Sequence, residues 1–72
     1  MEILVFVTNV ADLKAVSKIK PLLTAMPAIE DWNVDLDDCD RILRIVSNDH
    51  LCPRKVEATL QTAGFDCYEL GD

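Results

Sequence analysis

The chain has 72 residues, of which half are apolar and only two are glycine, a composition that favours one small folded domain over residues 1–72. Thirteen acidic residues against seven basic ones give a net charge of −6, which argues against nucleic acid or anionic lipid as a partner. Residues 1–10 are mostly apolar, but they are too few to span a bilayer and lack the basic flank of a secretory signal. We therefore expect a cytoplasmic protein that binds neither nucleic acid nor membranes.

The first predicted elements are a strand and a helix. Apolar residues on both faces of residues 3–7 predict a central strand of a sheet. Asn9 is placed to cap the following helix, with Asp12 three residues later as its capping-box partner. This helix spans about four turns, and Pro21 is expected to kink the last of them. Its apolar stripe, at three- and four-residue spacing, consists of Leu13, Val16, Ile19, Leu23 and Met26.

Two further strands are predicted after this helix. Residues 29–36 alternate, with Trp32 and Val34 among the residues that point inward. A polar turn at residues 37–40 leads into residues 41–46, which are rich in β-branched side chains and form the next strand. These two strands are therefore expected to pair as a hairpin.

A second helix and a last strand complete the chain. Pro53 suits the first turn of a helix, Gly64 suits the left-handed residue that ends it, and residues 65–70 alternate as a strand. The order strand, helix, strand, strand, helix, strand is that of two interleaved β-α-β units. It predicts an α+β, ferredoxin-like βαββαβ fold: a four-stranded antiparallel sheet of order 4-1-3-2, counted along the chain, with two helices on one face.

Two stretches of hydrophobic framework carry a resemblance to a known family. Residues 26–29, Met-Pro-Ala-Ile, lead to residues 32–36, Trp-Asn-Val-Asp-Leu, and residues 63–65 read Ala-Gly-Phe before the last strand. The chain is therefore similar, over nearly its whole length, to heavy-metal-associated (HMA) domains, which tend to show Leu-Pro-Gly-Val, Val-x-Val-Asp-Leu and Ala-Gly-Tyr at these places. This resemblance to small copper chaperones and to the N-terminal modules of metal-pumping ATPases implies the same ferredoxin-like fold.

The sequence departs from that family at its metal-binding motif. Counted back from Pro27, the two cysteines of the family's CxxC motif fall on Asp12 and Ala15, and the preceding Gly-Met-Thr becomes Asn-Val-Ala at residues 9–11. Soft Cu(I) favours sulfur ligands, which a carboxylate and a methyl group do not replace. The resemblance thus implies an HMA-like domain whose metal loop lacks its ligands, and we expect no cofactor there. Asp12 instead places a negative charge in the first helical turn, where the helix dipole favours it.

Cysteines elsewhere leave other sites open. Cys39, in the polar turn, is expected as an exposed thiol. The alternatives are a thiol that undergoes redox modification and a partner of Asp12 in an atypical metal site, because both residues lie at one end of the sheet. His50 and Cys52, at the opposite end, are too few ligands for a closed zinc site. Cys67 is expected in the core. The three cysteines have no CxxC spacing, so we expect no disulfide framework.

Six acidic residues between positions 30 and 40 form an acidic run. The run does not match an EF-hand calcium loop, because the glycine and the last glutamate that such a loop requires are missing. It is interpreted either as a solvated edge that discourages pairing between sheets, or as a docking surface for a basic partner.

The face of the sheet opposite the helices is the site that the sequence favours most. An apolar patch with one arginine is expected to project from it: Leu4, Phe6, Ile42, Arg44, Val46 and Tyr68. No nucleophile is paired with a base, so we do not expect an enzyme. The preferred hypothesis is a protein-interaction or regulatory module that binds a protein partner or forms a homodimer through this face. The alternatives are a copper or zinc carrier or sensor with atypical ligands and, by analogy of fold alone, a small-molecule-sensing domain.

Overall fold

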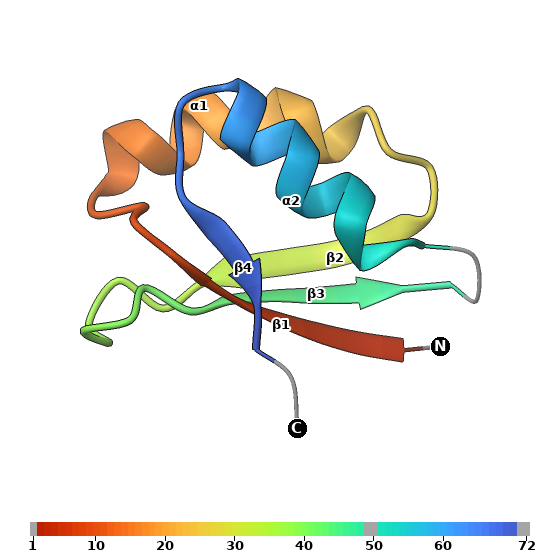
Figure 1. The fold of residues 1–72 in the computed structure, drawn as a ribbon, viewed down its shortest axis with the longest axis horizontal. Coiled ribbons are helices and arrows are strands. Elements are labelled where there is room, and N and C mark those ends of the chain that lie inside the picture. Colours follow the sequence, from red (N-terminus) through yellow and green to blue (C-terminus); the bar gives the residue numbers. More distant parts are fainter. Residues whose placement is uncertain (1, 49–50, 71–72) are drawn as a thin grey trace.

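The computed structural model describes residues 2–48 and 51–70. Its elements follow the predicted order: β1 (Glu2–Thr8), α1 (Leu13–Thr24), β2 (Ile29–Val34), β3 (Leu43–Ser47), α2 (Pro53–Thr62) and β4 (Cys67–Glu69). The strands form one antiparallel sheet of order β2-β3-β1-β4, and both helices cover one of its faces (Figure 1). The predicted ferredoxin-like fold and strand order are therefore confirmed. No helix in the described ranges is long and apolar enough to cross a membrane.

Helix α1 begins at a different cap from the one that the sequence predicts. Asp12, in extended conformation, is the N-cap, and its Oδ1 accepts a hydrogen bond from the N–H of Ala15 at 2.8 Å. Asn9, the expected cap, instead accepts a hydrogen bond from the N–H of Asp66 at 2.9 Å and links this loop to the segment before β4. Both residue types are good caps, and the contact with a distant part of the chain decides between them.

Pro53 and Gly64 occupy the positions that their backbone geometry favours. Pro53 is the first residue of α2, where the missing N–H leaves no helical hydrogen bond unmade. Gly64 follows the C-cap of α2 with a φ of +98°, a left-handed conformation that ends the helix. Pro21 lies inside α1, which continues to Thr24.

The core lies between the sheet and the helices, and it corrects the predicted phase of the first strand. Leu4 and Phe6 are buried in this core, 9% and 0% exposed, together with Leu43 and Ile45 of β3. The prediction that Leu4 and Phe6 project from the open face is therefore wrong. Both faces of β1 are apolar, so its alternation does not reveal which side is inside.

Ile42 is a second correction, because it is buried at 7% exposure. It directly follows Arg41, whose φ of 47° turns the chain just before β3 begins, and it is buried outside the core cluster. Arg44, Val46 and Tyr68 lie on the side of the sheet away from the helices, out of phase with the buried residues of β3 and β4.

Candidate functional site

The loop before α1, where the resemblance places a metal site, is occupied by groups that build the helix start. The carboxylate of Asp12 caps α1, and its carbonyl accepts a hydrogen bond from the N–H of Val16 at 3.1 Å. Ala15 is half-buried and packs against the core, and Val10 is fully buried beneath the loop. The helix start therefore offers one carboxylate that is already engaged as a cap, and no sulfur.

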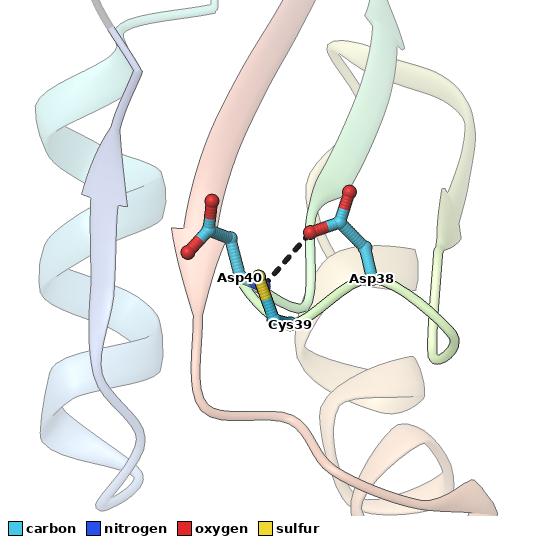
Figure 2. Close-up of side chains that lie close together, drawn as sticks. All are labelled: Asp38, Cys39 and Asp40. Carbon is cyan, nitrogen blue, oxygen red and sulfur yellow. Dashed lines mark hydrogen bonds between the residues drawn. The ribbon is translucent and has the colours of Figure 1, made fainter.

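A second candidate lies in the loop between β2 and β3. Figure 2 shows Asp38, Cys39 and Asp40 on one turn, and their potential ligand atoms lie within 4.8 Å of one another. Oδ1 of Asp38 also accepts a hydrogen bond from the N–H of Asp40 at 2.8 Å, so this carboxylate stabilises the turn as well. Asp12, the partner that the sequence suggested for Cys39, does not join this group in the described part of the chain.

The chemistry of this group is mixed. Carboxylates suit hard cations and a thiolate suits soft ones, so a set of two oxygens and one sulfur serves neither class fully. Within residues 2–48 and 51–70, the group contains no fourth histidine, cysteine, aspartate or glutamate. Cys39 and Asp40 are exposed, and Asp38 is only half-buried. The arrangement is therefore an open, three-residue cluster, not a closed coordination cage.

The same loop is tied to β1 by Thr8 and Arg41. The Thr8 hydroxyl donates to the carbonyl of Arg41 at 2.6 Å and accepts from the N–H of Val10 at 3.2 Å. The Arg41 guanidinium donates to the carbonyl oxygens of Leu36 and Asp38. Because this cation is bound to backbone carbonyls, it forms no ion pair with an acid of the loop among the described residues.

The remaining thiols lie apart from one another. Cys67 is fully buried, as the sequence predicts, and burial raises the pKa of its thiol to about 12, with a smaller contribution from the charge of Glu57. Cys52 is exposed and is the N-cap residue of α2 without a side-chain capping bond. His50, its predicted companion, lies outside the described residues. Cys67 is thus a core residue, and only Cys39 and Cys52 are accessible.

Cys52 borders a hollow of about 490 Å³ between the end of α1 and the start of α2. The lining is largely apolar, with Leu22, Met26 and Leu51 among its residues, and Lys55 is its one charged member in the described part of the chain. The sequence did not predict this hollow, because it is formed where two helices distant along the chain meet. Cys52 is therefore a thiol at the edge of an apolar surface and belongs to no ligand cluster in the described part of the chain.

The open sheet face is a further candidate surface, and we define it as the side of the sheet away from the helices. The strand register pairs Ile3 with Val46 and Val7 with Tyr68 across this face. Three of its large apolar residues are strongly exposed: Ile3 at 66%, Tyr68 at 57% and Leu70 at 56%. Its full set is Ile3, Val5, Val7, Asp31, Asn33, Arg44, Val46, Tyr68 and Leu70.

Sequence reasoning missed the β1 members of this face, namely Ile3, Val5 and Val7. The signal that identifies them is in β3, where Arg44 sets the outer phase between two buried residues. Because Val5 is the direct cross-strand partner of Arg44, it must lie on the same face. The apolar sequence of β1 offers no such marker.

Comparison with known proteins bears on the fold. No protein-family model matches the sequence, and no curated protein sequence matches it. The structure is similar to the yeast copper transporter domain Ccc2a, with a TM-score of 0.84 and 14% identity over 100% of this chain and 99% of the other. It is also similar to the HMA domain of the copper chaperone for superoxide dismutase, with a TM-score of 0.75 and 20% identity over 96% of this chain and 66% of the other.

A third similar structure is a complex, that of Atx1, Cu(I) and Ccc2a, with a TM-score of 0.83 and 14% identity over 100% of this chain and 99% of the matched chain. These matches show that the chain has the HMA fold over its whole length, as the resemblance implied. At the start of α1 this chain has Asp12 and Ala15.

Proposed function

We propose that this chain is a non-enzymatic protein-interaction domain whose helix-start loop does not bind soft metal and whose open sheet face binds a second copy of the chain. The observation that carries the proposal is the strong exposure of Ile3, Tyr68 and Leu70 on one face. Val5 and Val7, half-buried between them, make the apolar surface continuous across β1 and β4. A continuous apolar patch of this kind is typical of a contact surface.

The distribution of charge supports contact between like chains at this face. The chain carries a net charge of −6, yet β1 and β4 contribute no charged side chain to the open sheet face. Arg44 is the cation of the face, and Asp31 lies on its outer strand, β2. Two copies that meet over β1 and β4 therefore keep most of their acidic side chains outside the contact, where salt screens their repulsion.

The expected affinity is modest. Removing one large apolar side chain from water contributes about 1.5–3 kcal/mol when it becomes fully buried. Association costs about 4–15 kcal/mol of lost motional freedom, so a patch of this size yields a small net gain. Dimerisation should therefore be sought at high protein concentration, up to roughly millimolar.

The test is the mass of the chain in solution, measured by light scattering or sedimentation over a concentration series. We expect a dimer that dissociates on dilution and that Tyr68→Glu abolishes. Leu13→Glu is the matched control, because Leu13 is 74% exposed but lies on α1, away from the open sheet face. A chain that stays monomeric at the highest concentration, or a dimer that Leu13→Glu disrupts and Tyr68→Glu does not, would contradict the proposal.

A second candidate function is metal binding with atypical ligands, which the proximity of Asp38, Cys39 and Asp40 favours. The similarity to copper-transporting domains supports the same idea. Titration with Cu(I) and with Zn(II) under chelator competition tests it. Binding that Cys39→Ser removes and Cys52→Ser leaves intact would establish this site, and binding that neither substitution changes would eliminate it.

A further inference from the structure

The two edges of the sheet differ in how their outward-facing backbone groups are paired, and β4 is the sealed one. Backbone groups of an antiparallel strand point alternately toward its neighbour and away from it. The N–H of Leu70 donates to the carbonyl of Val5 at 2.8 Å, so the backbone N–H and carbonyl of the preceding residue, Glu69, point away from β1. That outward N–H donates to Oε2 of Glu57 at 2.6 Å, and the outward carbonyl of Cys67 accepts from Nε2 of Gln61 at 2.9 Å.

Helix α2 thus supplies one acceptor and one donor to the outer edge of β4. Glu57 and Gln61 lie four residues apart, on one face of the helix, at the spacing that lets both reach the strand. Their side chains occupy the positions that the backbone of an added strand would need. An incoming strand therefore finds the edge of β4 already taken.

The edge of β2 has no such cover. The N–H of Asp35 donates to the carbonyl of Ile42 at 2.8 Å, so alternation directs the backbone groups of Val34 and Trp32 outward. The outward N–H of Trp32 is bound only by the carboxylate of its neighbour Asp31, at 2.8 Å. Among the described residues, no hydrogen bond is made by the N–H of Val34 or the carbonyl of Trp32.

The β2 edge is acidic, which favours a basic partner. Glu30 and Asp31 are exposed on the strand, Asp37 and Asp40 are exposed on the following loop, and β2 itself has no basic residue. The ion pairs between described residues join Arg54 to Glu57 and Glu69, at the opposite edge of the sheet. None of them neutralises the acidic side chains of the β2 edge. A second copy presents the same acids and is repelled, whereas a basic strand is attracted.

We propose that the free edge of β2 binds an extended, lysine- or arginine-rich segment of a partner protein, which adds to the sheet as a fifth strand. Trp32 and Val34 supply the outward N–H and carbonyl groups of the new ladder. When the strand binds, the carboxylate of Asp31 releases the N–H of Trp32 and pairs with a cationic side chain of the incoming strand. This edge shares Asp31 with the open sheet face, but its backbone groups are those of Trp32 and Val34, and the proposal does not depend on dimerisation over β1 and β4.

The probe is an eight-residue peptide of alternating lysine and valine, titrated into the isotope-labelled full chain and followed by NMR. We expect amide shifts and slowed hydrogen exchange centred on Trp32 and Val34. The same peptide with N-methyl groups on alternate amides cannot donate to the edge, and we expect it to bind at least about tenfold more weakly. A peptide of alternating glutamate and valine should not bind, because its charge is that of the edge.

Two matched variants distinguish binding at the β2 edge from general attraction between a basic peptide and an acidic protein. Asp31→Asn and Asp66→Asn each remove one negative charge, but Asp66 lies between α2 and β4, away from β2. We expect Asp31→Asn to weaken binding several-fold and Asp66→Asn to leave it unchanged. The proposal is overturned if no binding occurs at millimolar peptide, if the N-methylated peptide binds equally well, or if the shifts centre on the open sheet face or on β4.

Discussion

The hydroxyl of Thr8, buried at the end of β1, donates to the carbonyl of Arg41 at 2.6 Å, across 33 positions of sequence. The same oxygen accepts a hydrogen bond from the N–H of Val10. One side chain therefore ties both the loop before α1 and the loop before β3 to the central strand β1. Thr8→Val keeps the shape but removes both bonds, so that the part-buried carbonyl of Arg41 and the buried N–H of Val10 lose this partner. We expect the free energy of unfolding to fall by about 1–3 kcal/mol in urea titrations. Thr8→Ser, which keeps the hydroxyl, should lose less, and equal losses would show that the hydrogen bonds are not the cause.

Substitutions at the start of α1 test whether Asp12 and Ala15 occupy the positions of the two CxxC cysteines. Asp12→Cys combined with Ala15→Cys places two thiols at CxxC spacing on the first turn of α1. We expect the doubly substituted chain to retain Cu(I) against a chelator that strips the metal from the unsubstituted chain, because Cu(I) favours sulfur ligands. Asp12→Ser with Ala15→Ser is the control. Equal retention by both double variants would mean that these positions do not correspond to the metal loop.

The thiols should differ in reactivity in a manner that burial explains. Only the thiolate reacts readily, and burial raises the pKa of Cys67 to about 12, so it stays protonated near neutral pH. Cys39 and Cys52 are exposed. A disulfide reagent at mildly alkaline pH should therefore label two thiols quickly in the folded chain and the third only after denaturant is added. Rapid labelling of Cys67 in the folded chain would contradict its burial.

Glu57 makes the stability of the chain dependent on pH. The hydrogen bond from the N–H of Glu69 is the main cause that lowers the pKa of this carboxyl, and the Arg54 guanidinium lowers it further. Because the folded pKa lies below the unfolded value of about 4.3, the carboxylate adds stability above that pH. This contribution is lost as the pH falls through the folded pKa. We expect Glu57→Gln to flatten the acid part of the curve of unfolding free energy against pH, and a curve of unchanged shape would contradict this role of Glu57.

Much of the fold follows from local signals in the sequence. Pro53 and Gly64 mark the two ends of α2, and the apolar stripe of α1 includes Ile19 and Leu23, which are fully buried. These signals are local, since a proline ring or a left-handed glycine has the same backbone preference in any context. The order of strands and helices then leaves few ways to close the sheet.

The surfaces were harder to predict because they depend on contacts between distant residues. The phase of β1 is set by its pairing with β3, through Val5 and Arg44, and not by its own apolar residues. The capping role moved from Asn9 to Asp12 because Asn9 binds Asp66, 57 positions away. In both cases the deciding partner is one that periodicity along the chain does not reveal. The cluster around Cys39 differs, because its partners Asp38 and Asp40 are neighbours in the sequence, whereas the prediction looked for a partner at the helix start.

The bonds from Glu57 and Gln61 to β4 also limit how large any assembly built on this sheet can become. A ribbon that grows by edge-to-edge addition needs two receptive edges on every subunit. This domain has one, so a strand taken up at β2 ends the series instead of extending it. For addition at the sheet edges the chain is therefore a terminal unit, because the side chains of Glu57 and Gln61 occupy the edge of β4.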